Sequence, residues 1–424
     1  MKKPLVAALF ATLGLGLSGN ALAQKTHTVA EGSDLSQFRS LRAEGMAALE
    51  KNDRQNALRL FTEAGNILPD SPSILLLKAQ AELELKRRPN AKALLSEYIR
   101  RGLTLDLGRH SEFIPIWDET LEAKLAENRS AKGAVTVLHT LPDLNLIEAL
   151  TVTDEGVIIV SAIHTGTISR VTDAGLEKIV AFRPGVAAQG VTWRNGQLWA
   201  TTAATRQTKG FDGPGKITSK IIRIDPANGT IAETFNTDIK RRLSDIHAGD
   251  EDLYVADFDT GEVLRLNGYK GTPEVLIPEG YLEAPQGLVE SADGRYLMVA
   301  DHSSGLYRVD LHEGSLIRLM APDNGVLMGM DSLLLYGNDI IAVQNGLKPE
   351  RILRLRMQPD WGGIDSAEVI LRGGPDVQEP SGAQIVGNRL IFVARSQWSE
   401  FNAQGLSDND TPKPALIGEI TLTP

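Results

Sequence analysis

Six polar residues stand at the same point of six related segments, each close to the start of an apolar run. They are Glu148, Gln189, Asp245, Gln286, Asp331 and Ser381, and their spacing is roughly 40 to 55 residues. Carboxylate and amide oxygens can bind a hard cation, and a carboxylate can also accept a proton. Such chemistry needs several of these side chains at once, so it depends on the elements that bring the segments together.

The segments share a strand pattern, a turn with Gly, Asn or Asp, and a second strand pattern. An example is LVESADGRYLMVADHSSGLYRVDL, which begins at residue 288. A period of this length with several strands per unit is typical of a β-propeller. The six copies predict a mainly β chain with a six-bladed β-propeller at residues 134–424. We also expect Val135–His139 to pair beside Ile417–Leu422 in the last blade, because this removes exposed strand edges.

The first strand of each unit runs outward and the second returns, so the polar lead and the end of the second strand meet at one end of the blade. This predicts that four leads surround one mouth of the central channel: Glu148, Asp245, Gln286 and Asp331. The residues expected on its rim are Asp257, Asp301 and Asn345. The competing interpretation is that these side chains cap turns or bond the backbone of a neighbouring blade.

Two segments carry a resemblance to a known family. PQGLVESADGRYLMVADHSSGLYRVDL (285–311) and MDSLLLYGNDIIAVQNG (330–346) resemble the six-bladed propellers of gluconolactonase and senescence marker protein (regucalcin). The resemblance implies a divalent cation on the propeller axis with Glu148, Gln286 and Asp331 as ligands, Gln286 standing where the family has Asn. It also implies substrate contacts from Arg242, Ser244 and Asp245, where Ser244 replaces a family Asn.

The chemistry implied by this resemblance is metal-dependent hydrolysis of lactones or related small esters. Oxygen ligands suit Ca²⁺ first, with Mg²⁺ and Zn²⁺ as alternatives. The cation polarises a carbonyl and acidifies a bound water, and Asp331 is the expected base, with Asp245 beside it. We expect the carboxyl groups of Glu148 and Asp331 to lie roughly 3 to 5 Å apart, close enough to share one ion.

Histidines and tryptophans near the mouth allow other interpretations. His164 and His302 both follow second strands, and His302 is a candidate catalytic base by similarity to propeller lactonases of the paraoxonase type. The alternative for His302 is a solvated residue in a turn. Three tryptophans lie in or beside strands and are interpreted as structural: Trp199, Trp361 and Trp398.

The first 130 residues differ from the rest. Residues 1–23 have the basic start, apolar stretch and small-residue end of a cleavable signal peptide, which predicts a periplasmic or secreted protein with no membrane span after cleavage. Residues 35–130 have helical spacing, and Asn56-Ala57-Leu58 recurs as Asn90-Ala91-Lys92, 34 residues later. This period resembles the tetratricopeptide repeat, which implies either a groove for a protein partner or a packing module.

Composition limits the remaining functions. The net charge of −10 argues against a nucleic-acid partner, which needs a basic face. The absence of cysteine excludes thiolate metal sites and a cysteine nucleophile. Three functions stay open: a metal-dependent hydrolase with a small-molecule substrate, a non-catalytic propeller that binds a ligand or protein, and a pure scaffold.

Overall fold

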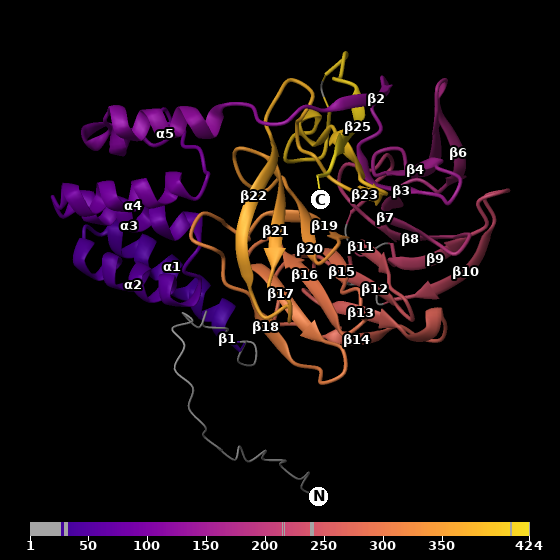
Figure 1. Ribbon diagram of the computed structural model, residues 1–424, viewed down its shortest axis with the longest axis horizontal. Coiled ribbons are helices and arrows are strands. Elements are labelled where there is room, and N and C mark those ends of the chain that lie inside the picture. Colours follow the sequence, from indigo (N-terminus) through magenta and orange to yellow (C-terminus); the bar gives the residue numbers. More distant parts are fainter. Residues whose placement is uncertain are drawn as a thin grey trace, which may run out of the picture.

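The computed structural model describes residues 27–28, 33–213, 215, 217–237, 241–407 and 409–423. The signal peptide predicted at residues 1–23 lies outside these residues. Helices occupy residues 33–129, and nearly all strands come after them (Figure 1). In the described part of the chain, no helix combines the length and apolar character needed to cross a membrane.

Six antiparallel sheets within the described residues form a six-bladed β-propeller, as the sequence predicts (Figure 1). Blade one contains β3 (Ile147–Val152), β4 (Ile158–Ala162), β5 (Thr167–Thr172) and β6 (Gly175–Ala181). Blade two contains β7 (Ala187–Arg194), β8 (Gln197–Ala203), β9 (Lys220–Ile224) and β10 (Ile231–Asn236). Blade three contains β11 (Leu243–Ala248), β12 (Leu253–Asp257), β13 (Val263–Leu266) and β14 (Glu274–Ile277).

The remaining blades complete the ring. Blade four contains β15 (Pro285–Glu290), β16 (Tyr296–Asp301), β17 (Gly305–Asp310) and β18 (Leu316–Arg318), and β1 (His27–Thr28) pairs with β18 as a fifth strand. Blade five contains β19 (Met330–Tyr336), β20 (Asp339–Gln344), β21 (Arg351–Met357) and β22 (Ile364–Arg372). Blade six contains β23 (Ala383–Val386), β24 (Arg389–Arg395), β25 (Ala415–Thr421) and β2 (Thr136–Leu141).

The ring closes through blade six, where a strand from the start of the propeller pairs with the last strand. Thr136 lies opposite Glu419, and His139 lies opposite Ile417. The predicted closure is therefore confirmed. A strand edge that would otherwise be open is paired, and the two ends of the propeller are joined by backbone hydrogen bonds.

The blades pack through the alternation of apolar side chains along their strands. Strand β16 shows this most clearly, because all six of its residues are buried. Met298 and Ala300 pack in the core shared with blade five, whereas Leu297 and Val299 pack in the core shared with blade three. Successive side chains of a strand point to opposite faces of the sheet. A strand in a blade that packs between two neighbouring blades is therefore apolar on both of its faces. Each buried side chain of this kind contributes roughly 1.5–3 kcal/mol.

The helical segment consists of helices that pack on their sequence neighbours. It contains α1 (Ser33–Glu50), α2 (Arg54–Ile67), α3 (Pro72–Glu84), α4 (Arg88–Arg100), the 3₁₀ helix η1 (Ser111–Ile116) and α5 (Glu119–Arg129). The helices α2 and α4 start 34 residues apart, and Ala57 and Ala91 are fully buried at equivalent places in them. The repeat family itself stays a prediction.

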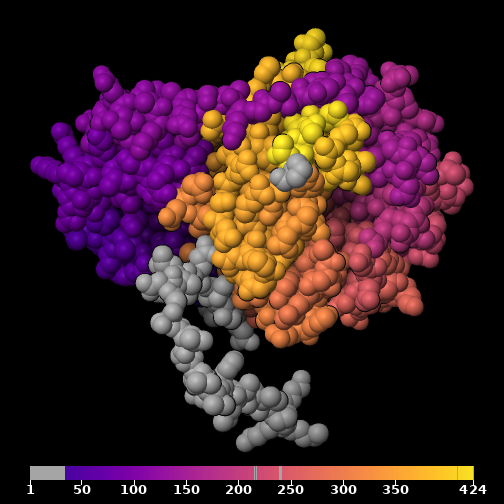
Figure 2. Space-filling view, viewed as in Figure 1, coloured from indigo at the N-terminus to yellow at the C-terminus, as the bar shows by residue number. Residues whose placement is uncertain are grey.

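The helices pack directly on blades four and five (Figure 2). Asp70, between α2 and α3, forms a buried ion pair with Arg318 at the end of β18. Val326 and Met328, in the connection between β18 and β19, belong to the apolar core of the helices. The helical segment and the propeller therefore share a core.

Candidate functional site

A pocket of about 340 Å³ lies at one end of the propeller axis, where the inner strands begin. Five polar residues from the inner strands of blades one to five line it: Glu148, Gln189, Ser244, Gln286 and Asp331. Other lining residues come from the ends of second strands and from loops, namely Thr205, Arg242, Phe258, His302, Asn345, Gly346, Glu379 and Trp398. The ring thus brings together residues that lie up to about 250 positions apart in the sequence.

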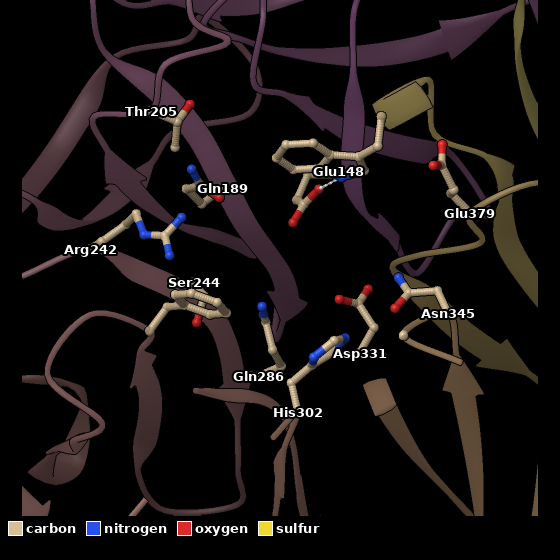
Figure 3. Close-up of a pocket in the computed structure, with 13 residues that line it drawn as sticks. Glu148, Gln189, Thr205, Arg242, Ser244, Gln286, His302, Asp331, Asn345 and Glu379 are labelled. Carbon is tan, nitrogen blue, oxygen red and sulfur yellow. Dashed lines mark hydrogen bonds between the residues drawn. The ribbon is translucent and has the colours of Figure 1, made fainter. Parts of the chain in front are cut away.

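The side chains turn toward the axis because each of these five inner strands is irregular at this point. The pairing register shifts between Ile147 and Leu150 in β3, and between Met330 and Ser332 in β19. Equivalent shifts occur in β7, β11 and β15. A bulge bends its strand and redirects a side chain, so the irregularities aim Glu148, Gln286 and Asp331 into the same space (Figure 3).

Glu148 and Asp331 form an electrostatically coupled carboxyl pair. Burial raises the pKa of Glu148, and the nearby charge of Asp331 raises that pKa further. Burial also raises the pKa of Asp331, while the positive charge of His302 and a hydrogen bond from Asn345 oppose the increase. Two carboxylates in one pocket repel each other, so without a cation the pair holds a proton up to a higher pH than ordinary carboxyl groups do.

Trp398 holds one oxygen of Glu148. Its indole Nε1 donates a hydrogen bond of 3.0 Å to Oε2, and this bond lowers the pKa of Glu148 (Figure 3). Trp398 starts the 3₁₀ helix η3 (Trp398–Glu400). The preceding Gln397 is 1% exposed and accepts hydrogen bonds from the backbone N–H groups of Asn145 and Leu146. Trp398, which the sequence analysis interprets as structural, thus also lines the pocket.

His302 lies in the turn that follows β16, where it is half-buried and lines the pocket wall near Asp331. Gly346 makes room for its ring, because a Cβ atom at position 346 would lie 2.4 Å from His302 Nε2. Asn345, also in the wall, donates to the carbonyl of Pro380 at 2.9 Å. The positive charge of His302 and a hydrogen bond from Asn345 thus act on the same carboxylate, that of Asp331.

Arg242 and Ser244 line the opposite wall. The guanidinium of Arg242 stacks 4.0 Å from the ring centre of Phe258, and its Nε donates to Asp259 at 2.9 Å. The guanidinium end faces the pocket (Figure 3). The hydroxyl of Ser244 donates to backbone carbonyls, with Pro285 O at 3.1 Å, so its proton is already engaged.

Asp245 lies deeper in the channel than the residues that line the pocket. It contributes to a second cavity of about 240 Å³, which is formed by the inner strands. Its carboxylate accepts hydrogen bonds from the backbone N–H groups of Ile246 at 2.8 Å and Leu288 at 3.3 Å. Burial raises the pKa of Asp245 to about 7, and the charge of Asp331 adds to the increase. Asp245 is thus close enough to the pocket for the charge of Asp331 to affect its pKa.

The prediction that Asp257 and Asp301 line the rim is wrong. Both are fully buried, and their carboxylates accept hydrogen bonds from backbone N–H groups. Asp257 binds the N–H of Arg242, and Asp301 binds that of Ala284 at 2.8 Å. Each one ties the end of a second strand to the lead of the same blade. This is the role given by the competing interpretation, that these side chains bond the backbone.

His164 also lies outside the pocket lining. Its Nδ1 is 2.6 Å from the carbonyl oxygen of Gln207, and its ring packs on Phe401 with centroids 5.1 Å apart. Burial lowers the pKa of His164. His164 therefore connects the loop between β8 and β9 with the loop between β24 and β25.

Several lining residues were not singled out as site residues by the repeat pattern. Thr205 and Glu379 lie in connections outside the repeated strands, where the sequence has no periodic signal. Gln189 is the lead of blade two; it is 5% exposed, and its Nε2 has no hydrogen-bond partner within the described residues. A buried amide N–H without a partner is costly unless something binds it. Gln189 therefore offers a donor to a ligand in the pocket.

The donor set fits a hard divalent cation in its chemistry. Two carboxylates and the amide of Gln286 supply oxygen atoms, and a cation would offset the repulsion between the carboxylates. The described residues contain no cluster of three or more His, Cys, Asp or Glu side chains arranged to hold a metal ion. The predicted set includes only two such residues, Glu148 and Asp331, with Gln286 as the third ligand.

Comparisons with known proteins reveal only distant structural similarity. No family model matches the chain, and no curated protein does. The PQQ-bound aldose sugar dehydrogenase of Streptomyces coelicolor is 14% identical, with a TM-score of 0.45 over 69% of this chain and 99% of that chain. A luciferin-regenerating enzyme is 12% identical, with a TM-score of 0.47 over 69% and 95%. The virginiamycin B lyase of Staphylococcus aureus is 16% identical, with a TM-score of 0.42 over 65% and 80%. Similarities at this level carry no inference about activity.

Proposed function

We propose that this protein is an exported, metal-dependent hydrolase of lactones or related small esters, as its resemblance to the gluconolactonase and regucalcin propellers implies. The observation that carries the proposal is the pair of half-buried carboxyl groups, Glu148 and Asp331, which blades one and five direct into one axial pocket. Packing alone gives no reason for two carboxylates to share one pocket, since they repel each other.

Glu148, Gln286 and Asp331 would hold the cation, with Ca²⁺ as the first choice. When bound, such an ion polarises a carbonyl group and lowers the pKa of water. The residues of the chain have separate tasks. Asp331 accepts the proton of the attacking water, since its carboxylate faces the pocket. The Trp398 hydrogen bond keeps Glu148 in one orientation.

The opposite wall would orient the substrate. The unpartnered Nε2 of Gln189 and the guanidinium end of Arg242 are donors for the polar oxygens of a lactone or ester. Phe258 and Trp398 add aromatic surface, which excludes water from the reacting bond. The pocket volume of about 340 Å³ suits a small molecule.

Metal titration followed by a hydrolysis screen tests the proposal. Chelator-treated protein is titrated with Ca²⁺, Mg²⁺ and Zn²⁺ by calorimetry and then assayed on aldonolactones and aryl esters with and without the bound ion. We expect Asp331→Asn to lose cation binding and at least about a hundredfold of the hydrolysis, the scale of general-base removal. Asp173→Asn, an exposed residue in a blade-one turn, is the matched control and should behave as wild type.

Ligand binding without turnover is the second candidate function. It is favoured by the Trp398 bond, which engages one of the two oxygens of Glu148, and by Gln286, whose side chain is one methylene longer than the Asn of the family. A protein that binds Ca²⁺ and a lactone but hydrolyses none of the substrates would support this candidate over the hydrolase.

A further inference from the structure

We infer that the helical segment holds the wall of the axial pocket that carries His302, Asp331 and Asn345, with Arg351 of β21 as the positioning residue. Its consequence for cation binding rests on the proposed function. The contacts that hold this wall do not depend on that function, because they join the helices to two propeller segments, residues 323–329 and 344–350.

Arg351 connects the helices to the propeller. Its side chain is 2% exposed, and the Nη1 atom donates to the backbone carbonyls of Arg101 and Gly102 at 3.2 and 3.1 Å. These carbonyls stand at the C-terminal end of α4, where helices lack internal donors and favour a positive charge. Gly102 has φ +79°, and a Cβ there would lie 2.4 Å from Arg351 Nη1. In the described part of the chain, the hydrogen bonds of Arg351 thus go to the end of α4 and to Gln344.

Gln344 carries this connection to the pocket. Arg351 Nε donates to Gln344 Oε1 at 2.6 Å, and Gln344 Nε2 donates to the carbonyls of Val326 and Met328 at 2.8 and 2.6 Å. Gln344 is fully buried and directly precedes the lining residue Asn345. Its amide therefore fixes the segment before Asp331 and the segment that bears Asn345 relative to each other.

Two backbone hydrogen bonds continue the path to His302. The N–H of Gly346 donates to the carbonyl of Gly329 at 3.0 Å, and the N–H of Gly329 donates to the carbonyl of His302 at 2.8 Å. Gly329 lies two residues before Asp331. Hydrogen bonds and short chain segments thus connect α4 to the backbone that bears His302, Asp331 and Asn345.

The helices touch the same two segments at further points. The N–H of Thr104 donates to the carbonyl of Lys348 at 2.8 Å, and Arg101 Nη1 donates to the carbonyl of Gly325 at 2.9 Å. Met328 is 6% exposed and packs in the helical core with Leu103. Apart from Gln344, which ends β20, both segments are connections rather than strands, so sheet hydrogen bonds do not hold them.

Hydrogen–deuterium exchange of the full chain tests the inference. Arg351→Met keeps the volume of the side chain but removes its bonds to α4 and Gln344. Arg351→Lys retains a cation for the α4 carbonyls without the planar fork that reaches Gln344 at the same time. Arg54→Met is the matched control, since in the described residues the hydrogen bonds of Arg54 go to Glu84 and Asn52, both in the helical segment. Arg101→Ala replaces Arg351→Met if that variant does not fold.

In Arg351→Met we expect peptides from 323–331 and 344–350 to exchange about tenfold faster than in wild type, the effect of losing one or two buried hydrogen bonds. In Arg351→Lys the exchange rates of these peptides should lie between those of wild type and Arg351→Met. The exchange rate of a blade-two peptide at 187–203 should not change in any variant. Exchange within about twofold of wild type in both pocket-side peptides of the folded variant would overturn the inference.

A calorimetric Ca²⁺ titration of the same proteins separates the inference from the proposed function. We expect Arg351→Met to bind Ca²⁺ about tenfold more weakly than wild type and Arg54→Met to bind equally well. Unchanged affinity in Arg351→Met would overturn the positioning role of Arg351. If wild type binds no Ca²⁺ while the exchange pattern is as expected, the proposed function fails and the wall held by the helices is supported.

Discussion

Asp245→Asn should reduce the pH dependence of stability in the cation-free protein. Asp245 has two backbone donors, Ile246 N–H and Leu288 N–H, and forms no ion pair within the described residues. Burial raises its pKa from 3.8 to about 7 in the folded protein. In the unfolded chain the carboxyl group titrates near its ordinary pKa.

The sign of the effect follows from proton binding. Between these two pKa values the folded protein holds a proton that the unfolded chain has lost, so the contribution of Asp245 is complete at low pH and is lost as pH rises to about 7. A difference from 3.8 to about 7 corresponds to roughly 4 kcal/mol at 1.36 kcal/mol per unit. Because Asp245 also borders a cavity, solvent screening reduces the expected loss to about 2 kcal/mol. The Asn side chain is neutral and should not show this loss, although one weaker backbone bond, worth about 1 kcal/mol, disappears at every pH.

Urea unfolding at pH 4 and pH 8 in the presence of a chelator measures the effect. From pH 4 to pH 8, wild type should lose about 2 kcal/mol more unfolding free energy than Asp245→Asn. Asp173→Asn controls for the loss of one surface carboxylate. If wild type and Asp245→Asn have the same pH dependence within about 0.5 kcal/mol, Asp245 is ionised at an ordinary pKa and our account of the channel is wrong.

Three further predictions concern the pocket. The positive charge of His302 lowers the pKa of Asp331, so His302→Ala should move the acid-side limit of Ca²⁺ binding to higher pH. Calorimetric titrations between pH 5 and 8 measure this limit, and an unchanged limit would contradict the interaction of His302 with Asp331. Trp398→Phe removes the hydrogen-bond donor that lowers the pKa of Glu148, so Ca²⁺ affinity near neutral pH should fall by about tenfold and recover in part at pH 8. Equal affinity of the variant at both pH values would argue against the hydrogen bond between Trp398 and Glu148. Gln286→Asn restores the side chain of the resembled family and should leave Ca²⁺ affinity equal or higher in the same titration, whereas a tenfold loss would exclude Gln286 as a ligand.

The sequence alone was enough to predict the architecture. Strand patterns of period two, broken by turns with Gly, Asn or Asp, are local signals, and their repetition predicted six blades and the pairing of β2 with β25. The same repeat located Glu148, Gln286 and Asp331 at the mouth, because every blade begins at the same end of the ring. These predictions needed only the order of the elements and the direction of each strand.

Only the tertiary structure decided which polar residues face the pocket. Asp245 and Asp331 are both leads, yet one lies deeper in the channel and the other lines the pocket, because local register shifts aim each side chain. Asp301 ends a second strand and Asn345 directly follows one, but the carboxylate of Asp301 is bonded to backbone N–H groups and to Ser304 in its own blade. The contact of Trp398 with Glu148 spans 250 residues and comes from an insertion without a repeat signal. Such contacts depend on side-chain direction and on packing between distant segments, and neither has a local signature in the sequence.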